Sequence, residues 1–246
     1  FQQTGTEFRV PGSESVRPGL SISSCNKAIA AIRRIFDVAL SVGAVARNPV
    51  EEMRGKRYRS VEQKEIDLPD AEDFLKMVEH ARGFADGKGR QQSATELIEG
   101  LAYSGMRLGE AKALTWGDVN QKRGVIRIRE GKTPAARRNI PIIPAMEDLL
   151  ARMLRRRESI GEGLAVSDKV FAVSEAMKTL TRACEQAGID RLTHHDLRHF
   201  FATVCIQSGV DIPTVARWMG HSDGGALAMR IYGHLRDEHS TRMAKG

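Results

Sequence analysis

Tyr232, near the end of the chain, follows three segments that carry arginine and histidine. Arg107 comes directly after a glycine, His195 and Arg198 are three residues apart, and His221 stands where a helix is expected to end. Attack on a phosphodiester builds negative charge on its non-bridging oxygens, and planar guanidinium groups match those oxygens in pairs. A tyrosine hydroxyl, with a pKa of about 10, is a weak nucleophile unless cations or a base assist it. Together these residue types fit phosphoryl transfer through a covalent tyrosine.

Each segment taken alone also has a plainer interpretation. Arg107 by itself is best explained as a surface arginine, although a cation is unfavourable at a helix start. His221 would more often cap a helix than act in catalysis. Tyr232 has the pattern of a half-buried aromatic residue that anchors a last helix. The pair His195 and Arg198 is harder to explain in this way, because three of the chain's seven histidines lie within 194–199.

The elements that must position these residues are expected to be mostly helical. Apolar residues recurring at intervals of three and four predict helices at about 21–40, 70–82, 94–103, 107–114, 145–158, 174–187, 196–208, 212–219 and 226–235. Alternation with a period of two predicts strands at 125–129 and 139–142, with a third short strand near 116–119. The predicted fold class is therefore mainly α with a small antiparallel β-sheet (α+β).

The turn between the two main strands is basic. It contains Lys132, and Arg129, Arg137 and Arg138 lie in or beside it. A lysine on such a turn is able to give a proton to the 5′ oxygen that leaves a cleaved phosphodiester. We therefore include Lys132 among the candidate catalytic residues.

Two domains are expected. Residues 1–19 read as loop, the helix after them is followed by the exit dipeptide Asn48-Pro49, and residues 54–64 are charged and poor in apolar side chains. This pattern predicts a partial helical domain with its linker at 1–60 and a second domain at 61–246. Because the chain begins with Phe1 and not Met, we expect it to be a fragment of a longer protein.

Composition limits the partners and the compartment. Lys plus Arg number 38 and Asp plus Glu 31, so the net charge is +7, which favours a polyanion such as nucleic acid. Cys25, Cys184 and Cys205 are far apart and odd in number, which favours a reduced, cytoplasmic location. No apolar run approaches a membrane span, and no leader pattern opens the chain. We expect no membrane partner.

Taken together, the motifs resemble the tyrosine recombinase (phage integrase) family over about 68–239. Residues 105–119 resemble the family's first-arginine box, with Glu110 in the place of its accompanying acidic residue. Residues 195–199 look like its HxxRH box, 220–222 like its GHS box, and Tyr232 stands in the nucleophile's place. The helix over 26–49 looks like the tail of the family's core-binding domain, which clamps DNA. The spacing from His221 to Tyr232 is longer than is usual in the family, so we expect a looser loop there.

The resemblance implies a mechanism. Tyr232 would attack the scissile phosphate and form a 3′-phosphotyrosyl bond, while Arg107, Arg198 and His221 hold the phosphate. Lys132 would protonate the leaving 5′ oxygen, and His195 would assist proton transfer at the tyrosine. The scheme uses no metal, no cofactor and no ATP.

The resemblance also implies partners. The expected substrate is double-stranded DNA, bound by a homotetramer on paired sites, with accessory DNA-bending proteins as further partners. The setting would be the nucleoid of a bacterium, with a bacterial or phage-encoded gene. Integration, excision and resolution all fit this scheme.

Three other functions stay open on the sequence. A type IB topoisomerase shares the chemistry but acts on one duplex. A DNA-binding regulator would keep the fold without catalysis. A metal-dependent nuclease or transposase needs converging carboxylates, and the acidic residues considered show no such grouping in the sequence: Asp67, Asp70, Asp118 and Asp196.

Overall fold

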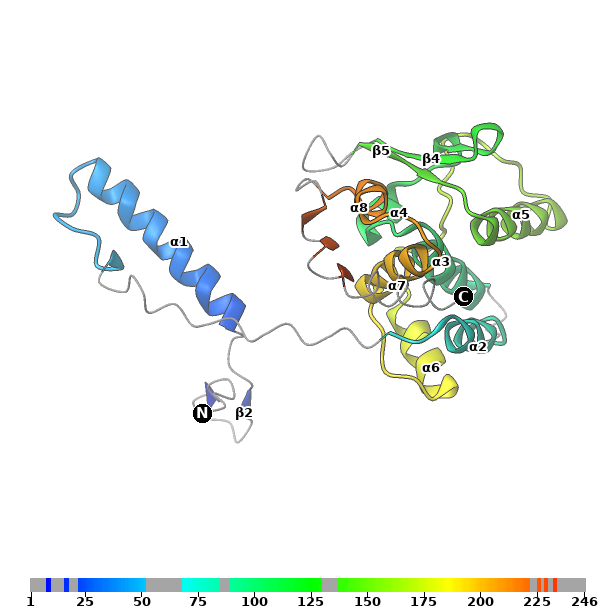
Figure 1. The fold of residues 1–246 in the computed structure, drawn as a ribbon, viewed down its shortest axis with the longest axis horizontal. Coiled ribbons are helices and arrows are strands. Elements are labelled where there is room, and N and C mark those ends of the chain that lie inside the picture. Colours follow the sequence, from blue (N-terminus) through cyan, green and yellow to red (C-terminus); the bar gives the residue numbers. More distant parts are fainter. Residues whose placement is uncertain are drawn as a thin grey trace, which may run out of the picture. The chain divides into compact units, whose positions relative to one another are not determined.

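The chain divides into two units, Phe1–Glu65 and Ile66–Gly246. The computed structural model describes residues 8–9, 16–17, 22–51, 68–84, 89–129, 137–221, 225–226, 228–229 and 232–233. Figure 1 shows the fold of each unit. The charged stretch expected to be a linker lies outside the described residues, and the assignment of the first unit to a DNA clamp stays a prediction.

The described residues of the first unit include one long helix, α1 (Ile22–Ser41), which ends before Gly43 as the sequence predicts. Ahead of it, β1 (Phe8–Arg9) pairs antiparallel with β2 (Val16–Arg17). The prediction of a loop or frayed end at 1–19 is therefore wrong for these two short strands. Strands of two residues are too short to give a periodic pattern, so sequence alone does not reveal them.

After α1 the chain turns back through Asn48. Its side-chain amide donates to the Asp37 carboxylate at 2.7 Å and to the Arg33 carbonyl at 3.1 Å. Apolar side chains on α1 are nevertheless left open to solvent, with Ile35 66% and Val38 58% exposed. The helix thus carries an apolar surface that the described part of its own unit does not cover.

The second unit is built mainly from helices at the predicted positions. They are α2 (Ala71–Arg82), α3 (Arg90–Ser104), α4 (Leu108–Ala113), α5 (Pro144–Ser159), α6 (Met177–Ala187), α7 (His194–Gln207) and α8 (Ile212–Met219). Asp70 caps α2 and Thr193 caps α7, each through a side-chain oxygen that accepts from the first turn. Of the last predicted helix, at 226–235, the described residues are helical and include Tyr232.

Two helices begin three or more residues away from the expected start. α3 starts at Arg90, four residues before the predicted start, because its first turn is polar and lacks the apolar periodicity. α6 starts at Met177, three residues later than predicted. The backbone N–H of Ala176 donates to the His194 ring at 3.1 Å, so a contact from another segment holds this start.

The sheet has the order β3-β4-β5 and is antiparallel throughout. Its strands are β3 (Val119–Asn120), β4 (Val125–Ile128) and β5 (Arg138–Pro141). The third strand predicted near 116–119 is present but lies later, at β3, because residues 116–118 form a 3-10 helix. The Asp118 carboxylate accepts from the backbone and the hydroxyl of Thr115, which curls this segment before β3 begins.

α3 lies at the centre of the unit and packs against α2, α5 and α7. Most of its residues are buried, in a large apolar core that also includes Phe74, Leu101 and Leu149. A smaller core joins α7 to α8 and contains the ring of Tyr232. The prediction of a mainly helical fold with a small antiparallel sheet is confirmed. The turn after α3 and the end of α8 lie beside each other, which brings the candidate residues together.

Candidate active site

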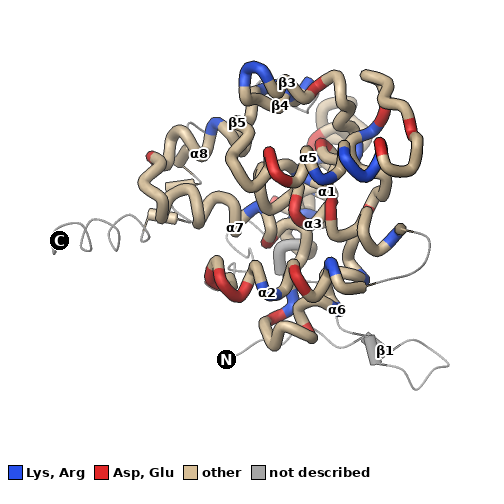
Figure 2. Tube along the Cα trace, turned by 90° about the vertical axis from the view of Figure 1, so that its right-hand side faces the viewer, with Lys and Arg blue, Asp and Glu red and all other residues tan. Residues whose placement is uncertain are grey.

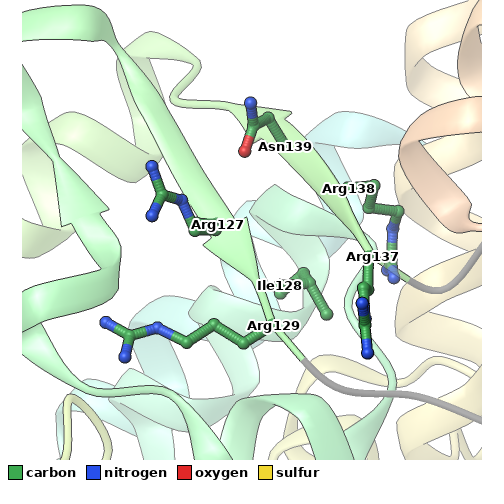
Figure 3. Close-up of a pocket in the computed structure, with 6 residues that line it drawn as sticks. All are labelled: Arg127, Ile128, Arg129, Arg137, Arg138 and Asn139. Atoms are coloured by element: carbon green, nitrogen blue, oxygen red, sulfur yellow. The ribbon is translucent and has the colours of Figure 1, made fainter.

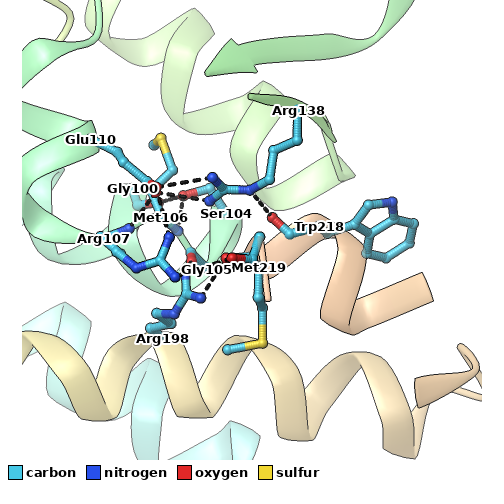
Figure 4. Close-up of polar contacts among 11 residues, drawn as sticks. Gly100, Ser104, Gly105, Met106, Arg107, Glu110, Arg138, Arg198, Trp218 and Met219 are labelled. Atoms are coloured by element: carbon cyan, nitrogen blue, oxygen red, sulfur yellow. Dashed lines mark hydrogen bonds and ion pairs between the residues drawn. The ribbon is translucent and has the colours of Figure 1, made fainter. Parts of the chain in front are cut away.

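Arg198 projects from α7 into the interior of the unit (Figure 4). The residue is 2% exposed, and its terminal nitrogens donate to the carbonyl of Gly105, at 2.6 Å, and to that of Met219. The first carbonyl belongs to the turn before α4 and the second to the end of α8, so one guanidinium joins both segments. Burial, together with the neighbouring cations Arg107 and Arg138, lowers the pKa of Arg198 to about 9.

Arg107 stands at the start of α4 as its N-cap residue. Its Nη1 donates to the Glu110 carboxylate at 3.0 Å, and its Nη2 donates to the carbonyl of Gly220 at 3.2 Å. Glu110 also accepts from the backbone N–H of Arg107 at 2.8 Å, which satisfies one donor of the helix start. Because its side chain is 46% exposed, Arg107 is open to an anion that arrives from solvent.

Arg138 on β5 completes the cluster, and the sequence analysis gave it no role. Its terminal nitrogens donate to the two oxygens of Glu110 at 2.9 and 2.8 Å, and its Nε donates to the Trp218 carbonyl. The Arg138 side chain is 4% exposed and that of Glu110 is 9% exposed, so the pair is buried. The sequence did contain a signal for this burial. Arg138 lies two residues before Ile140 on the same strand, so the two side chains point to the same face of the sheet, and Ile140 is fully buried.

Two glycines allow this close approach. Gly105 and Gly220 have φ values of +62° and +67°, in the left-handed region that favours glycine. A Cβ at Gly220 would lie 2.9 Å from a guanidinium nitrogen of Arg138, and one at Gly105 would lie 2.4 Å from the ring of Phe201. Both turns therefore require glycine for conformation and for space.

We expect acid to weaken the fold through Glu110. Burial alone would raise the pKa of this carboxyl, but hydrogen bonds from Arg138 and Arg107 outweigh it and lower the pKa below the usual 4.5. A depressed pKa stabilises the fold above the pKa of the unfolded chain, and that stability is lost as pH falls through the folded value. Urea unfolding at a series of pH values should show this loss.

Glu110→Gln should abolish the loss of unfolding free energy at low pH that is due to this carboxyl. It should also lower the free energy of unfolding at neutral pH by about 3 kcal/mol, because Arg138 is left buried without its counterion. Glu79→Gln, at an exposed position of α2, is the matched control. It should change little in either the pH dependence of stability or the free energy of unfolding at neutral pH. Equal behaviour of the two variants would show that the buried pair does not stabilise the fold.

Tyr232 is 3% exposed and packs in the smaller core. Its hydroxyl shares a hydrogen bond with Nδ1 of His199, and the two rings are 5.8 Å apart at their centroids. Burial raises the pKa of the hydroxyl, while Arg198 acts in the opposite direction. His199 is a second residue to which the sequence analysis gave no role, although it lies in the predicted HxxRH box.

The other histidines surround His199. His195 is exposed, and its ring lies edge-on to that of His199 at 4.5 Å. Burial and then Arg198 lower the pKa of His195. His221 is half-buried directly after α8 and, like His195, it contributes to lowering the pKa of His199. His194, by contrast, accepts from the backbone at the start of α6 and has a structural contact.

The structure thus brings most of the predicted residues into one region. Arg107 and Arg198 bond neighbouring carbonyls at the end of α8, Glu110 bonds Arg107, and Tyr232 bonds His199, which follows Arg198 on α7. Lys132 lies outside the described residues. Of the three guanidinium groups in this region, those of Arg107 and Arg138 bond the Glu110 carboxylate, and that of Arg198 bonds backbone carbonyls. Such an excess of like charge suits the binding of an anion.

The β4–β5 hairpin forms a second basic surface. A cavity of about 430 Å³ beside it is lined by Arg127, Ile128, Arg129, Arg137, Arg138 and Asn139 (Figure 3). Arg127 pairs directly across the strands with Asn139, and its side chain has no ion pair or hydrogen bond within the described part of the chain. Arg129 pairs with Asp118. Figure 2 shows the distribution of basic residues over this end of the unit.

The described residues offer little for other kinds of site. None of their histidine, cysteine and acidic side chains form a group of three or more that could hold a metal ion. No described helix has both the length and the apolar character needed to cross a membrane. Cys25, Cys184 and Cys205 are free thiols.

The sequence profile described as the phage integrase family matches residues 70–239. Among curated proteins, the chain is 34% identical to tyrosine recombinase XerA of Thermococcus kodakarensis over 149 residues, which are 58% of this chain and 51% of that protein. It is 24% identical to tyrosine recombinase XerC of Corynebacterium efficiens, over 95% of this chain and 76% of that protein. The chain thus spans about half the length of the first relative and about three quarters of the second.

Solved structures share the fold. An integrase of the Tn1549 transposon, in complex with transposon right end DNA, matches with a TM-score of 0.69 and 18% identity over 92% of this chain and 80% of that one. A lambda integrase dimer bound to a COC′ core site matches with a TM-score of 0.61 and 18% identity, over 82% and 73%. At this identity the likeness shows the fold alone.

Proposed function

We propose, from the premise that the chain belongs to the phage integrase family, that it is a site-specific DNA recombinase which cuts and rejoins DNA through a covalent bond to Tyr232. The observation that carries this proposal is the placement of Tyr232 beside the arginine cluster. The Tyr232 hydroxyl bonds His199, the residue after Arg198 on α7, while Arg198 and Arg107 bond the carbonyls of Met219 and Gly220 at the end of α8.

Arg107 and Arg198 are the residues proposed to hold the scissile phosphate. Their guanidinium groups would donate to its non-bridging oxygens, where charge grows in the transition state. His221 would add a third donor. Glu110 and Arg138 would act as positioning residues, because their buried pair fixes the turn that carries Arg107. Tyr232 is 3% exposed, so its hydroxyl must become accessible when DNA binds.

The bonds balance without an external energy source. The Tyr232 oxygen bonds to phosphorus, the bond from phosphorus to the 5′ oxygen breaks, and that oxygen takes a proton from Lys132. His195 would assist proton transfer at the tyrosine. Because the 3′-phosphotyrosyl bond keeps the energy of the broken one, attack by another 5′-hydroxyl rejoins the strand. No metal or cofactor takes part in the proposed steps.

The similar structures support double-stranded DNA as the substrate, since the Tn1549 integrase is in complex with transposon right end DNA and lambda integrase is bound to a core site. We propose further that four copies act on two paired sites, with DNA-bending proteins as accessory partners, in a bacterial nucleoid. The first unit, with the exposed apolar side chains of α1, would be the end of a core-binding clamp, within the proposed range 1–60. Integration, excision and resolution are equally compatible with this scheme.

The test is a nicked duplex that loses a short fragment after cleavage, so that the strand cannot be rejoined. The protein should remain bound to the labelled strand on a denaturing gel, joined to the 3′ phosphate and not to a 5′ end. Exchange of strands between two labelled duplexes would favour a recombinase, whereas relaxation of supercoils without exchange would favour a type IB topoisomerase. DNA binding with no adduct would favour a regulator, and an EDTA-sensitive cut without an adduct would favour a metal-dependent nuclease.

Arg127→Gln should weaken DNA binding uniformly across sequences and reduce the slope of log affinity against log salt by about one. The reason is that the exposed face of the β4–β5 hairpin carries arginines suited to backbone phosphates, and Arg127 has no competing partner among the described residues. Binding is measured by titration of a labelled duplex at several salt concentrations.

Lys178→Gln is the matched control for this change. Lys178 is an exposed cation on α6, which packs on α2 and α3, so its loss removes the same charge from another surface. For Lys178→Gln, the slope of log affinity against log salt should equal that of the unaltered protein. If both variants lose affinity equally, the effect comes from net charge, and the hairpin face has no special role in binding.

A further inference from the structure

The hydroxyl of Tyr232 has one hydrogen-bond partner among the described residues, and it is His199. The bond joins the hydroxyl to Nδ1 of the ring, and both residues are buried, at 3% and 8% exposed. His195, the histidine to which the family resemblance gives a proton-transfer role, is exposed and meets His199 edge-on at 4.5 Å. The residue in contact with the reacting oxygen is therefore not the expected one.

His199 is held in its neutral form. Burial, and then the neighbouring His195, lower its pKa to about 4, with Arg198 and His221 acting in the same direction and Asp196 opposing them. A neutral imidazole has one nitrogen with a free lone pair, whereas the protonated ring has none. At neutral pH Nδ1 is thus able to accept the phenolic proton, with the ring's own proton on Nε2.

Resting on the function proposed above, we infer that His199 is a catalytic residue which takes the proton of Tyr232 when the tyrosine attacks DNA and returns it when the strand is rejoined. In the forward step the phenolic oxygen bonds to phosphorus, its proton moves to Nδ1 of His199, and the 5′ oxygen leaves with a proton from another donor. In the reverse step the 5′-hydroxyl attacks, the bond from phosphorus to the tyrosine breaks, and the proton on His199 returns to the phenolic oxygen.

The charges around His199 suit this transfer when DNA is present. Burial keeps the ring neutral above all, and His195, Arg198 and His221 act in the same direction. A phosphate bound beside Arg198 adds negative charge in the same region, which offsets the charge of that arginine and raises the proton affinity of the ring. The base therefore becomes stronger at the moment at which the substrate arrives. His195, exposed beside His199, would exchange protons with solvent.

The test replaces His199 with Asn, whose amide lies near the position of Nδ1 and can accept a hydrogen bond but not a proton. Adduct formation on the nicked duplex should fall about a hundredfold at neutral pH, which is the scale of general-base catalysis. The rate of His199→Asn should then rise by roughly tenfold per pH unit, since solvent hydroxide must remove the phenolic proton. The rate of the unaltered protein should vary much less over the same range.

A second variant separates proton transfer from positioning. With 3,5-difluorotyrosine at position 232, a more acidic phenol of nearly the same shape, His199→Asn should recover most of its rate, whereas His195→Asn should not. Melting temperature and DNA retention are measured for every variant, so that a loss of folding is recognised.

Three results would overturn the proposal. They are a His199→Asn rate equal to that of the unaltered protein, a lowered rate with an unchanged pH profile, and recovery by the acidic phenol in His195→Asn alone. Because every comparison is made against the adduct of the unaltered protein, absence of that adduct would instead refute the proposed function.

Discussion

Replacing Tyr232 by Phe is expected to abolish the covalent protein–DNA adduct while leaving folding and DNA retention nearly unchanged. The substitution removes the oxygen that bonds to phosphorus and keeps the aromatic ring that packs between α7 and α8. The only described hydrogen bond lost is the one to His199. A single bond of this kind contributes about 1 kcal/mol to the free energy of unfolding, so the fold should survive.

The measurement for Tyr232→Phe is the denaturing gel of the nicked duplex, accompanied by a melting curve and a binding titration. Tyr103→Phe is the matched control, because Tyr103 is also buried and lies on α3 in the larger core. That variant should form the adduct at the usual rate. A covalent adduct with Tyr232→Phe would mean that another residue is the nucleophile, and the proposed mechanism would then be wrong.

Arg198→Ala should lower the rate of adduct formation a hundredfold or more, because preorganised donors to a developing oxyanion contribute about that much each. Binding of the duplex should be retained, since many phosphate contacts contribute to affinity and Arg198 is one buried group among them. The structure adds a cost in stability. The substitution leaves the carbonyls of Gly105 and Met219 without their donor, at about 1–3 kcal/mol for each buried group.

Arg198→Lys distinguishes charge from geometry. Lysine keeps the positive charge but is a point donor without the planar fork, so it cannot bond both carbonyls and a phosphate in the same way. We expect its rate to stay far below that of the unaltered protein. Adduct rate, melting temperature and DNA retention are measured for both variants. Parallel loss of DNA binding and cleavage would show that Arg198 acts only as a binding cation.

Much of the fold was predictable because its determinants are local. The apolar periodicity predicted α2, α5 and α8 to within one residue of their observed ends. The errors arose where a contact from elsewhere decides the start, as at α6, which is held by His194, or where elements are too short to show a period, as at β1.

The sequence by itself determined the types and order of the chemical groups: arginine after a glycine turn, the histidine and arginine of α7, and a late tyrosine. Only the tertiary structure decided which atoms meet. Glu110 bonds Arg138, 28 residues further along the chain, and Arg107 bonds Gly220, which is 113 residues away in sequence. Tyr232 bonds His199 and not His195. These contacts follow from the packing of α7 and α8 against the turn after α3. Side-chain periodicity describes one element at a time and carries no information on which elements pack together.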